Sequence, residues 1–285
     1  MKKNDQFEKN YSSLIIIYKK MIDVLYEREK INGSYLTRAA NSIMRIVINN
    51  KSDDIIRMVT IGIERTAGRV SHAVNSTILA GMCGYHLNYN EPDLHRLIEC
   101  GLLHDIGMFF IDREILEKDT PLTDEEIALI RKHPLKSYRI AKESGCVTED
   151  VLDGIIQHHE QVDGNGYPRK LKIDKIVEYA KILSIADNYE AQITPKKYRD
   201  AYSAHIAMKS MLSSAQTRYD PEILKKFMSI VTIYPIGTAV ILNDGTIGKV
   251  KSINHGKPLR PVIENDEGML IDLKDKIDLY IKGTV

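Results

Sequence analysis

Two short segments of the chain concentrate residues that bind metal ions. His158-His159-Glu160 places two imidazoles beside a carboxylate, and the turn Gly164-Asn165-Gly166-Tyr167-Pro168 follows almost at once. A second pair, His104-Asp105, lies upstream. Imidazole and carboxylate suit divalent first-row metals without thiolate ligands. The pattern indicates metal-assisted chemistry, in which two cations about 3.5–4 Å apart bind a phosphate oxygen and activate water for in-line attack.

These segments resemble the signature of the HD-GYP family, phosphodiesterases of the HD superfamily that hydrolyse cyclic dinucleotides such as cyclic di-GMP. The resemblance covers roughly residues 65–230 and fills the family's metal positions in order. It implies a binuclear site in which Asp105 is the bridging carboxylate. The ligands that it implies are His72, His104, Asp105, His133, His158, His159 and Asp187.

Each implied ligand has an ordinary alternative when it is taken alone. A single histidine such as His72 or His133 more often lies on a helix surface or in a core, and a single aspartate such as Asp187 more often ends a helix. The joint match favours the metal site, because independent accidents would have to coincide in register. The remaining histidines match no family position and are expected on the surface or in packing; they are His86, His95, His205 and His255.

The resemblance also implies roles beyond metal binding. Catalytic roles fall to His104, Asp105, Asp163 and Tyr167, and Tyr167 can donate a hydroxyl hydrogen bond. Glu160 and Asp163 are the local candidates to support the ligands. The family's basic motif after the last ligand corresponds to Lys196, Lys197, Tyr198 and Arg199, which are expected to bind substrate phosphate. An ordinary solvated basic face is the alternative for that cluster.

The chain departs from the family pattern at three positions. Met108 stands where a lysine often follows the His-Asp-Ile-Gly run, so one phosphate contact is lost. Gly68 stands where some members carry a glutamate for a third metal, and Glu64 lies two turns from His72, which predicts a two-metal site. Lys196 keeps a positive charge but lacks the planar fork of arginine.

The composition excludes several classes of partner. The 285 residues carry 40 basic and 39 acidic side chains, so the net charge of +1 gives no general attraction to duplex nucleic acid or to an anionic membrane. No apolar run approaches the ~18–20 residues that cross a bilayer, and no signal-peptide pattern opens the chain. The cysteines Cys83, Cys100 and Cys146 are scattered, which fits a reduced compartment. We expect a soluble cytoplasmic protein without membrane insertion.

Three regions are expected to position these residues. Residues 1–65 predict helices, with an apolar stripe that includes Leu14, Met21 and Leu25 and that packs on the main domain or forms a homodimer or regulatory interface. Residues 66–231 predict an all-helical domain that carries the metal site. Residues 232–285 predict a small antiparallel β appendage, with hairpin turns at Asn243-Asp244-Gly245 and 265–268.

The expected function is hydrolysis of a cyclic dinucleotide, with cyclic di-GMP converted to pGpG by a hydroxide that bridges two metal ions. Iron or manganese suits the ligand set best, and zinc is also compatible with it. Two alternatives stay open. One is a binding protein for a cyclic dinucleotide or a protein partner, favoured by Met108. The other is a phosphodiesterase for another cyclic dinucleotide, such as cyclic GMP-AMP.

Overall fold

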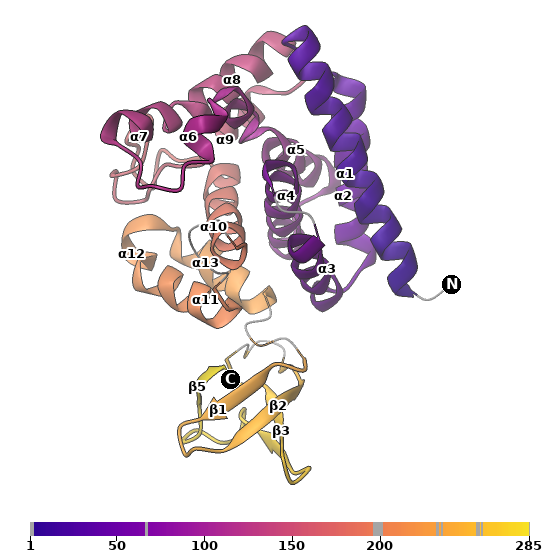
Figure 1. The fold of residues 1–285 in the computed structure, drawn as a ribbon, viewed down its shortest axis with the longest axis vertical. Coiled ribbons are helices and arrows are strands. Elements are labelled where there is room, and N and C mark those ends of the chain that lie inside the picture. The colour runs from indigo at the N-terminus through magenta and orange to yellow at the C-terminus, as the bar shows by residue number, and fades with distance from the viewer. Residues whose placement is uncertain are drawn as a thin grey trace.

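The computed structural model describes residues 3–65, 68–195, 202–231, 234, 236–254, 257 and 259–284, with the backbone alone at 3–7, 57 and 60–65. These residues form a helical body followed by a small antiparallel sheet (Figure 1). The prediction of a mainly helical fold with a C-terminal β appendage is confirmed. The divisions at residues 65 and 231 stay predictions.

The helical body is built around α4, which is buried along almost its whole length. Helices α10, α5, α2, α3 and α1 all pack against α4. The helices are α1 (Lys3–Arg28), α2 (Gly33–Asn49), α3 (Ser52–Arg65), α4 (Arg69–His86), α5 (Glu91–Leu103), the 3-10 helix η1 (Ile106–Phe110), α6 (Arg113–Leu116), α7 (Asp124–Ile130), α8 (His133–Ser144), α9 (Glu149–Gln157), α10 (Glu178–Ile193), α11 (Ala204–Ser213), α12 (Ala215–Arg218) and α13 (Pro221–Ile230).

Local capping residues set the starts of several helices. The Asn32 side chain accepts hydrogen bonds from the first amides of α2, and Asn90 does the same for α5. Thr123 and Glu126 form a reciprocal capping box at α7. Asp220 caps α13 in front of Pro221. These caps fix where each helix begins and therefore where the side chains of its first turn lie.

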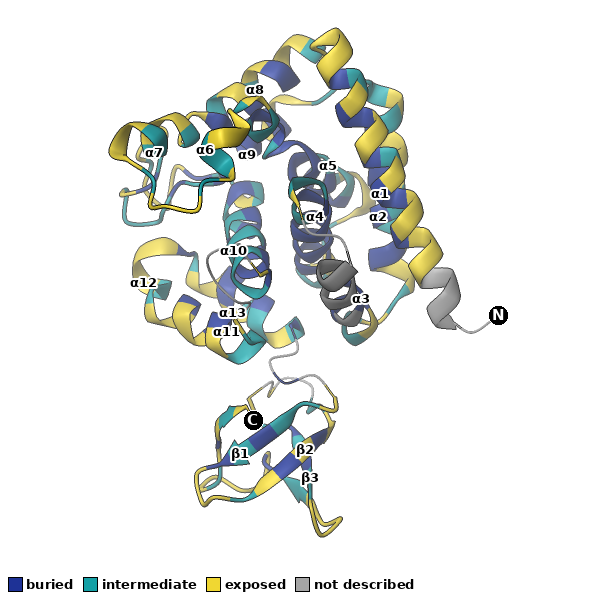
Figure 2. Cartoon of the chain, viewed as in Figure 1, coloured by how far each residue is buried: buried dark blue, intermediate teal, exposed yellow. Residues whose placement is uncertain are grey.

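Helix α1 contributes its apolar stripe to the same core as the other helices. Leu14, Met21 and Leu25 are buried there. The buried side of α1 faces the other helices (Figure 2), and α1 packs on α2 and α4. The buried Tyr18 hydroxyl donates a hydrogen bond to the carbonyl of Leu102 at 2.7 Å, which ties α1 to α5. The stripe therefore packs within the chain, while Ile16 on the opposite side is 54% exposed.

The C-terminal sheet has the strand order β4-β3-β2-β1-β5, and all pairs are antiparallel. Its strands are β1 (Ala239–Leu242), β2 (Ile247–Ser252), β3 (Val262–Asn265), β4 (Leu270–Asp272) and β5 (Ile281–Thr284). Both predicted hairpins are present, β1–β2 and β3–β4. Val240, Val250 and Ile263 form the buried side of this sheet. The sheet lies beyond α13 (Figure 1), whereas the predicted metal ligands lie in helices or directly after them.

Candidate metal centre

The predicted metal ligands converge from five helices. His72 lies in the first turn of α4, His104 and Asp105 directly follow α5, and His133 opens α8. His158 and His159 follow the end of α9, and Asp187 lies in α10. The structure arranges all seven in two adjacent groups whose potential ligand atoms lie within 4.8 Å of one another; these are Asp105, His133, His158 and His159, and His72, His104 and Asp187.

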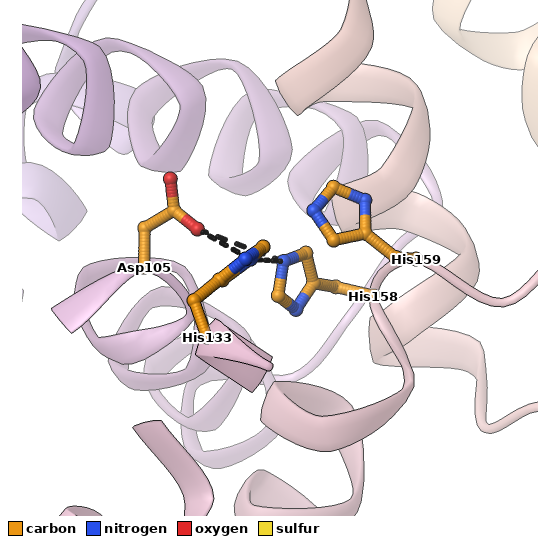
Figure 3. Close-up of side chains that lie close together, drawn as sticks. All are labelled: Asp105, His133, His158 and His159. Carbon is orange, nitrogen blue, oxygen red and sulfur yellow. Dashed lines mark hydrogen bonds and ion pairs between the residues drawn. The ribbon is translucent and has the colours of Figure 1, made fainter. Parts of the chain in front are cut away.

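The first group surrounds one oxygen of Asp105 (Figure 3). Asp105 Oδ1 lies 3.0 Å from His133 Nε2 and 3.7 Å from His158 Nε2. The two Nε2 atoms are themselves 3.2 Å apart. His159 completes this group of three imidazoles and one carboxylate. Such a donor set suits a divalent transition metal.

The second group surrounds Asp187 on α10. Asp187 Oδ1 lies 2.9 Å from His72 Nε2 and 3.8 Å from His104 Nε2. The other oxygen of Asp105, Oδ2, lies 3.6 Å from His72 Nε2 and 3.7 Å from His104 Nε2. Asp105 therefore presents one oxygen to each group, which is the arrangement of a carboxylate that bridges two cations.

Backbone carbonyls at helix ends orient three of the histidines. The Nδ1 atoms of His104, His133 and His158 lie 2.6, 2.8 and 2.6 Å from the carbonyls of the residues three positions earlier, at Gly101, Ile130 and Ile155. These carbonyls belong to the last turns of α5, α7 and α9, where a helix leaves its acceptors without intrahelical donors. A proton on each Nδ1 satisfies them and leaves each Nε2 lone pair free for a metal.

One of the potential ligand atoms lacks a hydrogen-bond partner within the described part of the protein, as a metal site predicts. His104 Nε2 is fully buried and has no hydrogen-bond partner among the described residues, although it points at both carboxylates. An unsatisfied buried polar atom is costly, and coordination to a cation would satisfy it. The residues present therefore fit the binuclear metal centre that the motifs imply.

The pKa values in the first group favour the ligand forms. Burial, followed by the neighbouring His159, holds the pKa of His158 well below its usual value, and burial lowers the pKa of His159 to about 4. Burial by itself raises the pKa of Asp105, but His104 and His133 outweigh it and hold that pKa well below the usual value. Neutral imidazoles and an ionised carboxylate are the forms that bind metal.

The second group behaves differently at His72. Burial by itself lowers the pKa of His72, but Glu190 and Asp187 outweigh it and raise that pKa well above its usual value. The pKa of His104 is raised as well, because Asp105 and Asp187 outweigh its burial. Without a cation this group therefore retains protons that metal binding has to displace.

Glu190 is the main site residue that the sequence did not reveal. Its carboxylate contacts Nδ1 of His72 and accepts hydrogen bonds from the Asn75 amide at 3.1 Å and from the Thr194 hydroxyl at 2.9 Å. Its only signal in the sequence is a charged residue three positions after Asp187, on a helix whose face is otherwise apolar. Asn75, three positions after His72, gives an equally weak signal.

Glu160 stabilises the loop that follows the paired histidines by direct hydrogen bonds to its backbone. Glu160 is 3% exposed and accepts the amides of Arg169 and Leu171 at 2.6 and 2.8 Å, so it contacts the loop backbone rather than the ligands. Gly166 packs against the backbone of Glu160 and Gln161, where a Cβ would lie only 2.3 Å from the Gln161 nitrogen. Glycine is therefore required at this close approach.

Of the other predicted catalytic residues, Tyr167 lies beside a predicted ligand, whereas Asp163 lies outside both ligand groups. The Tyr167 ring lies against the His159 ring, with centroids 4.7 Å apart and planes inclined at 30°. Burial, followed by Asp105, raises the pKa of Tyr167, so its hydroxyl keeps its proton. Asp163 accepts from the amide and side chain of Asn165 at 2.9 and 2.7 Å and lies outside both ligand groups. The predicted substrate-binding residues Lys196, Lys197, Tyr198 and Arg199 lie outside the described residues.

Two arginines that the sequence analysis did not single out lie near Tyr167. The guanidinium of Arg131 lies 5.4 Å from the centre of the Tyr167 ring, on an exposed side chain two positions before His133. Both Arg131 and Arg218 act electrostatically on the Tyr167 hydroxyl. Met108, in η1, is half-buried. Positive charge near the ligand groups is therefore present even though position 108 carries none.

The model of the HD domain family matches residues 47–223, more than half of the chain. The chain therefore belongs to the HD domain family, and the resemblance to HD-GYP proteins is confirmed. Across the described residues, every helix is too short or too polar to cross a membrane.

Two curated proteins and one solved structure illustrate the family. The chain is 31% identical over 209 residues to the cyclic di-GMP phosphodiesterase PdeB of Borreliella burgdorferi, covering 73% of this chain and 55% of that protein. It is 30% identical over 231 residues to the cyclic di-GMP phosphodiesterase PA4108 of Pseudomonas aeruginosa, covering 81% and 52%. The chain thus spans about half the length of these relatives. Bd1817, an HDG"Y"P protein from Bdellovibrio bacteriovorus, shares the fold with a TM-score of 0.60 at 18% identity, over 77% of this chain and 76% of that one.

Proposed function

We propose that the protein is a metal-dependent phosphodiesterase that hydrolyses a cyclic dinucleotide, with cyclic di-GMP converted to pGpG. One observation carries this proposal: Asp105 presents one oxygen to each of two imidazole-rich groups. The names of the curated relatives support the substrate class. A linear product follows from a site with two cations rather than three, because Gly68 offers no third-metal ligand.

The seven converging side chains would hold the two cations. His133, His158 and His159 would bind one cation, and His72, His104 and Asp187 the other, with Asp105 shared between them. Iron or manganese suits this set of nitrogen and oxygen donors, and zinc is compatible with it. When bound, such a pair supplies an activated water for in-line attack and neutralises charge on the phosphate oxygens.

The protein's own residues orient the reacting groups. The carbonyl anchors fix the ring planes of His104, His133 and His158, so the donor atoms are already in place before substrate arrives. Tyr167, whose ring lies against that of His159, offers a protonated hydroxyl beside the site. Lys196 and Arg199 would hold the phosphate, and Asp163 would keep the turn in shape through Asn165.

Arg131 and Arg218 compensate for the missing lysine at position 108 in this proposal. The guanidinium of Arg131 lies 5.4 Å from the centre of the Tyr167 ring, and the centre of that ring lies 4.7 Å from the centre of the His159 ring. Tyr167 therefore links Arg131 to a predicted metal ligand. Guanidinium groups match phosphate oxygens in a bidentate manner. The second phosphate of a cyclic dinucleotide would bind there while the first lies at the metals.

The test is turnover of anaerobically purified protein that has been loaded separately with Fe(II), Mn(II) and Zn(II). Cyclic di-GMP and cyclic GMP-AMP serve as parallel substrates, and chromatography resolves the products. Metal-dependent pGpG supports the proposal, and faster turnover of cyclic GMP-AMP would reassign the substrate. GMP as the main product would contradict the two-metal interpretation.

A binding protein without turnover is the second candidate, and Met108 is the observation that favours it. Loss of a phosphate contact could leave affinity for the ligand while it removes catalysis. Tight binding of cyclic di-GMP by the metal-loaded protein, with no product over hours, would favour this candidate. Self-association through the N-terminal helices is a separate proposal, which sedimentation of the full chain tests.

A further inference from the structure

His72 is oriented differently from the other anchored histidines of the centre. His104, His133 and His158 use carbonyls from the last turn of a helix, where acceptors are free. His72 lies in the first turn of α4, where the carbonyl three positions earlier belongs to Arg69 at the start of the helix and not to a helix end. Its Nδ1 instead contacts Oε2 of Glu190 on α10, which leaves Nε2 facing Asp187 and Asp105.

Glu190 is fixed in turn by donors on both sides. Its Oε1 accepts the Asn75 amide at 3.1 Å and the Thr194 hydroxyl at 2.9 Å, and the side chain is 1% exposed. A carboxylate can only accept, which matches three converging donors. Glutamine at this position would turn an amide donor toward at least one of them.

The chain of contacts continues into the N-terminal helix. The hydroxyl of Tyr11, on α1, donates to Asn75 Oδ1 at 2.8 Å, and Asn75 is fully buried. Because its oxygen is occupied by Tyr11, the Asn75 amide nitrogen faces Glu190. Tyr11 lies 64 residues from Asn75 and outside the residues that match the HD domain model.

We propose that Glu190 is a positioning residue for His72 and that Tyr11 completes its support, so that helix α1 sets the metal affinity of the His72–His104–Asp187 group. The inference rests on the metal centre of the proposed function, but it does not depend on which substrate is hydrolysed. The other group, around His133, has its own carbonyl anchors at Ile130 and Ile155.

The test uses the full chain stripped of metal and titrated with Mn²⁺ by calorimetry. Glu190→Gln is expected to weaken the weaker of the two Mn²⁺ affinities by about 10- to 100-fold, the usual effect of losing an outer-shell partner. Tyr11→Phe is expected to weaken it by about 2- to 10-fold, the net contribution of one hydrogen bond. The tighter affinity is expected to stay unchanged in both variants. The spin-coupled electron paramagnetic resonance signal of paired Mn²⁺ should fade while the single-ion signal persists.

Matched controls separate positioning from general destabilisation. Glu178→Gln changes a carboxylate on the same helix that receives the Tyr89 hydroxyl. Tyr234→Phe removes a buried tyrosine hydroxyl that lies 2.6 Å from His205 Nδ1, a histidine outside both ligand groups. Both controls should leave the two Mn²⁺ affinities intact, even where thermal unfolding of the metal-free protein shifts.

Equal weakening of both affinities, or lowered stability with both affinities intact, would overturn the inference. His72→Ala identifies which affinity belongs to the His72 group. Two Mn²⁺ ions bound by the unmodified protein without hydrolysis of either cyclic dinucleotide would refute the proposed function alone. Absence of a second Mn²⁺ site in the unmodified protein would refute the metal centre and this inference together.

Discussion

Asp105→Asn is expected to disconnect the two halves of the metal centre. The substitution is nearly isosteric, but it removes the negative charge and replaces one oxygen with an amide donor. Asp105 Oδ1 faces His133 at 3.0 Å and Oδ2 faces His72 at 3.6 Å, so either orientation of the amide turns a donor toward one group. Both metal affinities should therefore fall.

The magnitude follows from what the shared carboxylate does. Loss of a ligand should exceed the roughly 10- to 100-fold effect on metal affinity of losing an outer-shell partner. A cation at the reacting phosphate contributes several kcal/mol to the transition state, and each ~1.4 kcal/mol is tenfold in rate. Turnover of cyclic di-GMP should accordingly drop by about 10³-fold or more.

The assay measures metal content and initial rates side by side for the unmodified protein and Asp105→Asn. Asp174→Asn is the matched control, because its carboxylate is 67% exposed and paired only with its neighbour Lys175 among the described residues. Circular dichroism of the metal-free proteins establishes that the variant folds. Two metals per chain with an unchanged rate in Asp105→Asn would refute the bridging role.

Three further outcomes follow from the same geometry. Met108→Lys adds an ammonium to η1, so the KM for cyclic di-GMP should fall by about 2- to 5-fold. Steady-state kinetics measures this change, and an unchanged KM would place position 108 away from the phosphates. Gly107→Ala brings a Cβ to 2.4 Å from the His133 carbonyl, so urea unfolding should show a loss of about 1–3 kcal/mol, with weaker metal loading. Acidification from about pH 8 to about pH 6 should release the metal at His72 first, because the pKa of His72 is raised and that of His159 is lowered to about 4. Metal analysis across this range checks the order, and simultaneous release would contradict it.

Local signals in the sequence predicted the elements, and the motif predicted which side chains converge in the two groups. Thr123 and Glu126 indicate a helix start, because a capping box forms between residues that are close in the sequence. The Asn243-Asp244-Gly245 turn predicts its hairpin for the same reason. Glu190 escaped prediction because its partner His72 lies 118 residues away, and only the packing of α4 against α10 joins them.

Glu160 shows a related limit of sequence reasoning. Its position beside the paired histidines indicated support for the metal ligands, yet its oxygens accept the amides of Arg169 and Leu171. The direction of a side chain at the end of a helix depends on the following loop, which adjacency in sequence does not reveal. The same applies to Asp163, whose carboxylate binds Asn165.

The proposed ligands come from α4, α8 and α10 and from the ends of α5 and α9, so a bound metal pair would also join these segments to one another. A ligand that binds only the folded state adds stability that grows with its free concentration. The lifetime of this protein in the cell should therefore follow the supply of metal. The metal-free protein should accordingly unfold more readily than the metal-loaded protein and be cleaved faster by proteases.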